Sequence, residues 1–495
     1  MKTLSTVLLT SMIVGFAKSV PVTEDLGRTW NILSLDGGGI RGLITAKVVD
    51  YMEREAYDYA EKQYCIPKRD NKRVSMAEIF DLVAGTSTGS LLATALVIPH
   101  DDPNSTQTNK FFAQKAIEVY TEMAPIVFTK FKMTLKSRMI GTACFLAFGL
   151  LVGFLIGVKM YHNTGFEENI KVLKMMVKTR KRSIKGKEEK NMSQMLAQSF
   201  EKKVLDGDSE LLKNQIQEGT LSVVQNAEDK IFNEELKYME KKGRKWIVML
   251  IGGIIMAFLG WVLMPKFFSL TKSSYDRRGI ESICNEMFGN IRIQDALTKE
   301  VNIVAYEYNS HQPRVFSKFS SHALPQNYSV GISNASEASS AAPIYFDPKV
   351  IGEQVLIDGG VIANNPAFYA YLHSKYANKQ EKIRVISIGT GEQAGKNLDP
   401  KSVDKLDWAM QIGTLITVVE ATTHDYLMKQ LPEDYYRFQK IMTESLALDS
   451  YADKDIEKLL KYGDDLVKER KQDIKKSIRQ VVDQVFGEEK GYKCQ

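Results

Sequence analysis

Two long apolar runs interrupt the alternation of polar and apolar positions along the chain. Residues 139–158 and 246–264 contain no charged side chain over twenty and nineteen positions. A helix needs about twenty apolar residues to cross the core of a bilayer. Trp246 and Trp261 lie near the ends of the second run, where tryptophans often anchor membrane helices. The pattern predicts two transmembrane helices; a buried helical pair in a soluble core is the alternative.

Small residues recur at helical spacing within both runs. The first run carries Gly149, Gly153 and Gly157 on one stripe, and small residues let two membrane helices approach closely. The matching stripe on the second run consists of Gly253, Ala257 and Gly260. The two helices are therefore expected to pack as a hairpin.

Two crossings return the chain to the same side of the membrane, so the segments before and after this packed hairpin can meet.

The start of the chain and the loop between the apolar runs carry weaker patterns. A basic start and an apolar run from Leu4 to Ala17 predict a secretory signal peptide over residues 1–19, with an uncleaved anchor or a buried strand as alternatives. Residues 160–245 are rich in lysine and arginine. The positive-inside rule then predicts a cytosolic loop and luminal or extracellular flanking halves, in a membrane of the secretory system. We expect the loop to be a solvated helical hairpin, with self-association or contact with anionic headgroups as alternatives.

The remaining composition limits the partners of the chain. At 495 residues it has room for one large α/β domain and an appendage. The 66 basic and 60 acidic residues are too balanced to indicate nucleic-acid binding. Four cysteines do not make a disulfide scaffold, and unpaired thiols are expected, although Cys65, Cys284 and Cys494 could form one pair.

Short patterns punctuated by glycine carry the candidate chemistry. Residues 79–84 are typical of a buried strand and residues 90–97 of an apolar helix, with Ser87 in the turn between them, inside Gly-x-Ser-x-Gly. Such a turn needs glycines because the serine backbone is strained and neighbouring strands lie close. The hydroxyl then projects at a helix N-terminus, where backbone N–H groups favour developing negative charge. An ordinary strand–helix turn is the competing interpretation.

A second glycine loop, at residues 36–42, also joins a predicted strand to a predicted helix. Its exposed N–H groups suit an anion, either a nucleotide phosphate or the oxyanion of a tetrahedral intermediate. The spacing matches G-x-G-x-x-G, but the acidic residues about twenty positions on lie in a charged helical stretch and not at a strand end. With a serine elbow downstream, we prefer the oxyanion hole over a nucleotide site or an empty turn.

Asp358 ends a third predicted strand and is followed by two glycines. A serine nucleophile needs a base to accept its proton. His373 and His424 would fit the order Ser, Asp, His, but both lie in sequences typical of helices. The sharper hypothesis is that Asp358 is itself the base, which would require burial to raise its pKa.

In this order, the motifs resemble those of the patatin-like phospholipase family. Its Asp-Gly-Gly-Gly-x-Arg-Gly loop corresponds to residues 36–42, its serine elbow to residues 85–89 and its Asp-Gly-Gly turn to residues 358–360. The similarity extends over about residues 28–135 and 271–470. Further matching segments lie at residues 338–346, 364–366, 387–391 and 434–439.

The resemblance implies an α/β fold with a mostly parallel central sheet flanked by helices, and hydrolysis of lipid acyl esters without a metal or other cofactor. Carried over to this chain, it implies that Ser87 is the nucleophile and Asp358 the general base. Arg41 would fix the glycine loop. The oxyanion-hole N–H groups would come from Gly37, Gly38 and Gly39, with the choice of two donors left open, and the supporting glycines would be Gly85, Gly89, Gly359 and Gly360.

Together these patterns predict a membrane-anchored serine lipid acyl hydrolase acting on phospholipids or related glycerolipids. The alternatives are a lipid transacylase and a non-catalytic scaffold or storage-like protein that keeps the fold. The expected domain order is a signal peptide at 1–19, a first catalytic part at 28–135, an insertion at 136–270, a second catalytic part at 271–400 and a helical region at 401–495 that completes the catalytic domain. Within that last region, residues 412–431 form an amphipathic candidate helix that could cover the sheet, and residues 454–476 alternate in charge as exposed helices do.

Overall fold

The structure is a computed structural model that describes residues 27–102, 105, 107–130, 133–162, 174–175, 178, 221–271, 273–318, 330–393 and 412–494. It divides into two compact units. We call Met1–Phe131 together with Lys272–Gln495 the sheet unit, and Lys132–Thr271 the insertion unit. The predicted signal peptide and most of the loop at 160–245 lie outside the described residues.

An eight-stranded sheet forms the centre of the sheet unit, with the order β5-β6-β3-β2-β1-β7-β9 and β4 paired to β3. The five strands β3, β2, β1, β7 and β9 run parallel, while β4, β5 and β6 add antiparallel pairs at one side. The prediction of a mostly parallel sheet is therefore confirmed. The strands are β1 (Trp30–Leu35), β2 (Leu82–Thr86), β3 (Glu300–Glu307), β4 (Gln312–Phe316), β5 (Lys349–Ile351), β6 (Gln354–Asp358), β7 (Ile383–Ile388) and β9 (Tyr435–Phe438).

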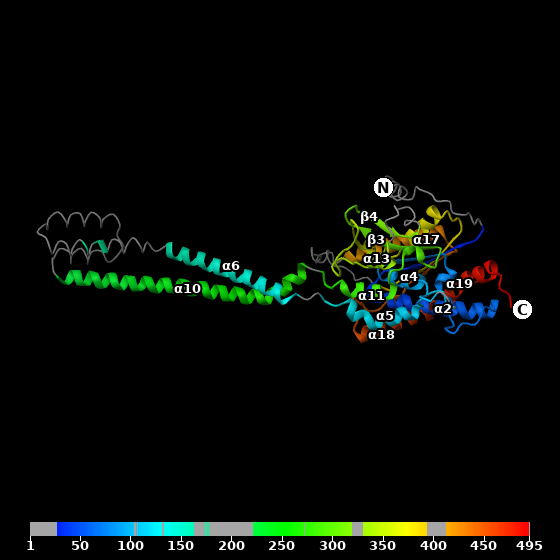
Figure 1. The fold of residues 1–495 in the computed structure, drawn as a ribbon, viewed down its shortest axis with the longest axis horizontal. Helices are drawn as coiled ribbons and strands as arrows, with labels where there is room; N and C mark the ends of the chain where they lie inside the picture. Colours follow the sequence, from blue (N-terminus) through cyan, green and yellow to red (C-terminus); the bar gives the residue numbers. More distant parts are fainter. Residues whose placement is uncertain are drawn as a thin grey trace. The chain divides into compact units, whose positions relative to one another are not determined.

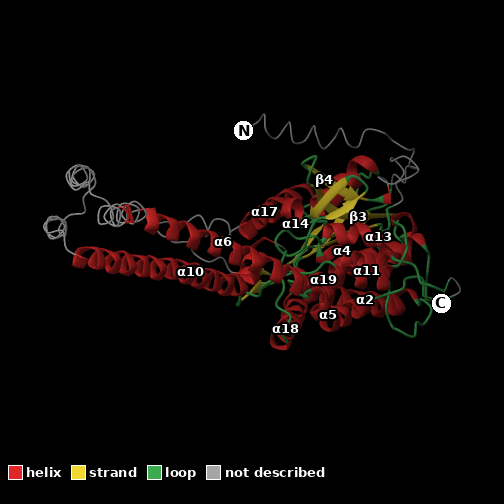
Figure 2. Cartoon of the chain, turned by 60° about the vertical axis from the view of Figure 1, so that its left-hand side comes forward, coloured by secondary structure: helices red, strands yellow, loops and turns green. Residues whose placement is uncertain are grey.

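Helices cover both faces of this sheet, as Figures 1 and 2 show. The helices are α2 (Gly42–Tyr64), α3 (Met76–Ile79), α4 (Thr88–Val97), α5 (Ala113–Val127), α11 (Arg278–Phe288), α13 (Ile332–Ser339), α14 (Gly360–Ala363), α15 (Ala367–Leu372), α17 (Ile412–Gln430), α18 (Asp453–Glu469) and α19 (Lys471–Val482). A separate two-stranded sheet pairs β8 (Glu392–Gln393) with β10 (Ile441–Met442).

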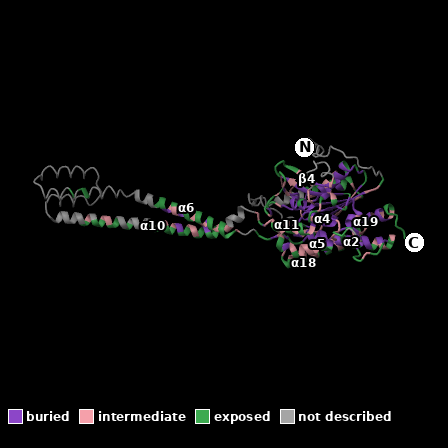
Figure 3. Cartoon of the chain, viewed as in Figure 1, coloured by how far each residue is buried: buried purple, intermediate pink, exposed green. Residues whose placement is uncertain are grey.

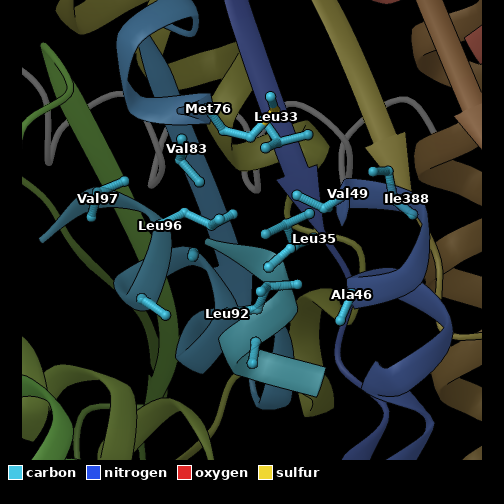
Figure 4. Close-up of a cluster of buried hydrophobic side chains, with 14 of the residues drawn as sticks. Leu33, Leu35, Ala46, Val49, Met76, Val83, Leu92, Leu96, Val97 and Ile388 are labelled. Atoms are coloured by element: carbon cyan, nitrogen blue, oxygen red, sulfur yellow. The ribbon is translucent and has the colours of Figure 1, made fainter. Parts of the chain in front are cut away.

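Alternate residues of each strand pack into two different hydrophobic cores, one on each face of the sheet, because successive side chains point to opposite faces. Leu33 and Val83 belong to the larger cluster, which includes residues of α2 and α4 (Figure 4). Ile32 and Leu82 pack instead into a second cluster with residues of α15 and α17. The nearly continuous apolar strands follow from this two-sided burial, which parallel sheets require.

The charged C-terminal stretch is only partly exposed. Residues 454–476 fall in α18 and α19, whose apolar sides are buried at Ile456, Leu459, Ile474 and Ile478. The alternating charges therefore mark the solvent side of two amphipathic helices, and the stretch is not an exposed helix throughout.

A disulfide joins Cys65, which caps the C-terminal end of α2, to Cys494. The expectation of unpaired thiols was wrong for this pair, which 429 residues separate. Cys284 is free and buried, and burial raises the pKa of its thiol.

The insertion unit consists mainly of α6 (Leu135–His162) and α10 (Leu221–Thr271), which contain the two predicted apolar runs and pack side by side. Glycines allow this approach. A Cβ on Gly149 would lie 2.6 Å from the Met256 Cβ, and one on Gly260 would lie 2.7 Å from the Phe145 Cβ. In Figure 3, the described parts of both helices expose much of their surface.

Within the described residues, one helical segment is long and apolar enough to cross a membrane: Leu135–Ile156 of α6, with a mean hydropathy of 2.4. The apolar segment of α10, Met249–Pro265, is shorter. The structure does not show a two-helix transmembrane hairpin, which stays a prediction.

Candidate active site

Ser87 lies on a strained turn between β2 and α4, with φ of 52° and ψ of −128°. This backbone conformation is unfavourable for a residue other than glycine, and such strain tends to occur at functional sites. The flanking glycines make the turn possible. A Cβ on Gly85 would lie 2.4 Å from the Gly89 carbonyl oxygen, and a Cβ on Gly89 would lie 2.2 Å from the Leu35 carbonyl oxygen. The turn therefore presents the serine hydroxyl at the start of α4.

The Ser87 hydroxyl donates a hydrogen bond to Asp358 Oδ2 at 2.6 Å. Asp358 ends β6, and its second oxygen, Oδ1, accepts the N–H of Gly360 at 2.6 Å. A side chain at Gly359 would not fit, because its Cβ would lie 2.1 Å from the Val304 carbonyl oxygen. The two glycines after Asp358 thus allow β6 to end against β3 with its carboxylate aimed at Ser87.

Burial raises the pKa of Asp358 from 3.8 to about 6, although the hydrogen bonds from Ser87 and Gly360 partly oppose the shift. The carboxyl group is mostly ionised at neutral pH and is a stronger proton acceptor than an ordinary aspartate. Its electrostatics therefore suit a general base.

Ser339, in α13, fixes the backbone of the serine turn. Its hydroxyl accepts the N–H of Ser87 at 2.8 Å and donates to the Val304 carbonyl at 2.5 Å. The residue falls in the matched segment 338–346, but no single-residue signal in the sequence pointed to this contact.

Of the three glycines predicted to line the oxyanion hole, one has an occupied N–H group and two have available N–H groups. Gly37 donates to the backbone carbonyl of Asn364 at 3.0 Å. Among the hydrogen bonds of the described residues, none has the N–H of Gly38 or Gly39 as donor. Two adjacent free N–H groups of this kind can stabilise an oxyanion, so Gly38 and Gly39 are the better donor pair of the three predicted glycines.

Side chains from segments far along the chain stabilise this loop by hydrogen bonds to its backbone. The Gly37 carbonyl accepts hydrogen bonds from Asn364 Nδ2 at 3.1 Å and from Thr390 Oγ1 at 2.8 Å. The Asn364 amide also donates to Glu420 of α17. Nothing in the sequence singled out Glu420, which lies in an amphipathic helix with no motif of its own.

Two arginines anchor the ends of the same loop. Arg41 Nε donates to the Gly38 carbonyl at 3.4 Å, where the resemblance placed a loop-fixing residue. Arg437, from β9, pairs with the buried Asp36 carboxylate at 2.5 Å and also donates to the Ser387 hydroxyl. Burial opposes the charge on Arg437, but the ion pair with Asp36 raises its pKa overall. Burial also raises the pKa of Asp36 to about 7, although Arg437 opposes that shift. The hydrogen bond between the two side chains holds β9 against the loop.

The two histidines that could have served as bases contact other groups. His373 Nε2 lies 3.2 Å from the buried Glu300 carboxylate, and His424 Nδ1 lies 3.4 Å from the Tyr435 hydroxyl. Burial lowers the pKa of His424. The carboxylate that contacts the Ser87 hydroxyl is that of Asp358. Within the described ranges, no three metal-ligating side chains gather into a possible metal site.

Comparison with known proteins gives one family. The sequence model of "Patatin-like phospholipase" matches residues 33–371. Patatin-like protein 2 from Oryza sativa subsp. indica is 22% identical over 477 residues, which cover 88% of this chain and 83% of that protein. Patatin-like protein 2 from Arabidopsis thaliana is 35% identical over 102 residues, covering 21% of this chain and 22% of that protein. The crystal structure of VipD from Legionella pneumophila aligns at 12% identity over 96% of this chain and 72% of that chain, with a TM-score of 0.30.

Proposed function

This chain belongs to the patatin-like phospholipase family, and we propose that it is a membrane-anchored lipid acyl hydrolase with a Ser87–Asp358 dyad. Membership of the family implies lipid acyl hydrolase activity. The observation that best supports the proposed dyad is the 2.6 Å hydrogen bond from Ser87 Oγ to Asp358 Oδ2.

The proposed reaction begins when Ser87 Oγ attacks the carbonyl carbon of an acyl ester. Asp358 accepts the hydroxyl proton as the new C–O bond forms, and the carbonyl oxygen becomes an oxyanion. The N–H groups of Gly38 and Gly39 stabilise that oxyanion. Collapse of the intermediate expels the lipid alcohol, which takes the proton from Asp358.

Water then completes the cycle. Asp358 deprotonates a water molecule, whose oxygen attacks the acyl-enzyme carbonyl, and the fatty acid leaves as Ser87 regains its proton. A lipid alcohol in place of water would give transacylation, which uses the same residues. The substrate class we propose is the acyl ester of a phospholipid or related glycerolipid.

The proposed anchor is the pair of helices in the insertion unit. Large apolar side chains face solvent on both helices, an arrangement that is unfavourable in water and typical of lipid-facing surfaces. Arg138 stacks on the Trp261 ring at 3.9 Å, near one end of both apolar runs, as interfacial residues do. The exposed side chains include Phe148, Leu151, Leu155, Ile251, Ile254 and Phe258.

We place the sheet unit on the luminal or extracellular side, in a membrane of the secretory system. The Cys65–Cys494 disulfide supports this side, because disulfides persist in oxidising compartments and are rare in the cytosol. The predicted signal peptide supports it independently. Residues 160–245 would then be cytosolic and available for self-association.

Labelling with a serine-directed fluorophosphonate, together with fatty-acid release from mixed phospholipid vesicles, tests the proposed function. We expect wild type to be labelled and active in the presence of a chelator, and Ser87→Ala to lose both properties while staying folded. A folded wild-type protein that is neither labelled nor active would favour the scaffold alternative. Acyl transfer to an added lysolipid faster than hydrolysis would favour the transacylase.

A further inference from the structure

The loop Pro343–Pro348 exposes apolar side chains in an unusual backbone conformation. Ile344 has φ of 75°, in the left-handed region, and its side chain is 74% exposed. Left-handed backbone is markedly unfavourable for a β-branched residue. Because the Ile344 side chain is exposed, no hydrophobic burial within the fold offsets this strain. Pro343, Pro348 and Val350 are exposed beside it.

This apolar tip lies close to the active site along the chain and in space. Ser339, five residues before Ile344, binds the Ser87 N–H, and the Ala341 carbonyl accepts the N–H of Asp358. Tyr345, next to Ile344, donates its N–H to the Ala342 carbonyl at 3.1 Å, one position after Ala341. A surface that contacts Ile344 would therefore lie near the proposed active site.

The same tip lies where the chain leaves the sheet unit for the insertion. The Ile344 carbonyl accepts the N–H of Ser274 at 2.8 Å. Tyr275 forms an isolated bridge with Lys130, and the N–H of Asp276 donates to the Thr129 carbonyl at 3.0 Å. Both chain exits and the Ile344 loop thus form one hydrogen-bonded cluster within the sheet unit.

Short connections then limit how far this cluster can move from the apolar helices. Lys130 precedes the first residue of α6, Leu135, by five positions, and Ser274 follows the last residue of α10, Thr271, by three. A fully extended chain spans at most about 3.5 Å per residue, or roughly 18 Å and 10 Å for these connections. If α6 and α10 lie in a bilayer, Ile344 is within reach of its surface.

We propose that Ile344 and its exposed neighbours insert into the lipid interface and hold the active site against the bilayer. This inference rests on the proposed lipid hydrolase function and on the membrane hairpin. Isoleucine and proline supply apolar contact, and exposed Lys130 beside the tip can interact with anionic headgroups. The occupant of the tip is lipid, and not a second copy of the chain or a soluble protein.

The test uses the full-length protein reconstituted into vesicles of phosphatidylcholine and phosphatidylserine. Fatty-acid release from the vesicle lipid is compared with hydrolysis of a soluble short-chain nitrophenyl ester by the same preparation. Ile344→Ser should lower the vesicle rate by about tenfold or more, the factor expected when one isoleucine side chain is no longer buried. Hydrolysis of the soluble ester should not change.

Ile441 gives a matched control, because it is 66% exposed, lies on β10 and is not one of the residues bonded in the cluster. Ile441→Ser should leave both rates unchanged. Ile344→Gly should lower the rate of fatty-acid release from vesicles as much as Ile344→Ser does. Its melting temperature should be unchanged or higher, because glycine adopts a φ of 75° without strain. Equal losses on both substrates, no loss for Ile344→Ser, or the same loss for Ile441→Ser would overturn the proposal.

A second measurement does not depend on activity. Ile344→Trp should gain fluorescence quenching by brominated lipids relative to wild type, and Ile441→Trp should not. Quenching that is equal in the two variants would reject lipid insertion of the tip, even in an active enzyme. Wild type that is inactive on both substrates, with quenching specific to position 344, would instead reject the proposed hydrolase function and keep the membrane contact.

Discussion

The backbone N–H of Gly37 donates to the backbone carbonyl of Asn364 at 3.0 Å, while the Asn364 side chain donates back to the Gly37 carbonyl at 3.1 Å. This reciprocal pair connects the first glycine loop to the segment that follows Asp358, across 327 positions. It removes Gly37 from the possible oxyanion donors and fixes the peptide that precedes Gly38 and Gly39.

Gly38→Ala should damage catalysis more than folding. A Cβ at this position would lie 2.2 Å from Thr390 Oγ1, so the loop must shift and carry the Gly38 N–H away from the oxyanion. Loss of one oxyanion-hole donor typically lowers kcat by about 10²–10³-fold. Steady-state kinetics on a soluble ester measure the effect, with Gly27→Ala as control because nothing lies within 4 Å of its added Cβ. A Gly38→Ala enzyme with wild-type kcat would contradict this donor assignment.

Asp358→Asn should stop the reaction and leave the fold intact or more stable. Asparagine keeps the size of the side chain and can still hydrogen-bond to Ser87, but it cannot accept the proton, so the rate should fall by about 10²–10⁴-fold. The fluorophosphonate labelling rate and the melting temperature are measured together. A fully labelled, fully active Asp358→Asn protein would point to another base, with His373 and His424 examined first.

Activity should depend on pH through Asp358, whose pKa is raised to about 6. The base must be ionised, so kcat/KM should fall about tenfold per pH unit below 6 and level off above it. The profile is measured on a soluble ester, and the reference is the residual rate of Asp358→Asn. A plateau that extends unchanged down to pH 4 would exclude Asp358 as the base.

The same pKa shift has a stability consequence of opposite sign. Because the folded-state pKa of Asp358 lies above its ordinary value, protonation favours the folded state. The stabilisation is fully present below about pH 4 and is lost as pH rises through about 6. Asp358→Asn should therefore exceed wild type in unfolding free energy at pH 7 by on the order of 3 kcal/mol, and by little at pH 4. Denaturant titrations at the two pH values measure this difference; an equal gap at both would contradict it.

The parts of the site that could be predicted from the sequence are those at which local sequence determines local structure. The elbow at Ser87 and the turn at Asp358 are each a strand end followed by small residues, and a side chain at Gly89 or Gly359 would collide with a neighbouring strand. The glycines are therefore visible in the sequence because the backbone cannot form these turns without them. The resemblance then supplied the roles that the patterns alone left open.

The contacts that could not be predicted from the sequence join segments that lie far apart along the chain, through residues of common types. Glu420 reaches Asn364 from a helix without a motif, and Arg437 reaches Asp36 across 401 positions. Neither pairing follows from spacing, because the order of the strands decides which loops meet at one edge of the sheet. The Cys65–Cys494 disulfide is similar, since it requires the chain end to return to α2. Four cysteines without a spacing pattern gave no sign of that return.

Removal of the disulfide should lower stability without changing the chemistry. Cys494→Ser frees the C-terminal segment from α2, and loss of a native disulfide typically costs about 2–4 kcal/mol of unfolding free energy. Thermal unfolding of the oxidised wild type and the variant measures the loss, and the soluble-ester rate should stay unchanged. Peptide mapping under non-reducing conditions is the control: recovery of Cys65 and Cys494 as separate thiols would show that the pair does not form.

Deletion of residues 133–271 should release an active sheet unit from the membrane. Lys130 and Tyr275 lie two and three residues from the ends to be joined and already pair as an antiparallel bridge, so a few glycine and serine residues can connect the two parts. All the proposed catalytic groups lie in the sheet unit, and the shortened chain should keep the wild-type rate on a soluble ester. Carbonate extraction should leave the full-length protein and its Ser87→Ala variant in the pellet and the shortened chain in the supernatant. Release of the full-length protein would contradict the membrane hairpin, whereas a shortened chain that stays in the pellet would assign the anchor to the apolar run at residues 4–17.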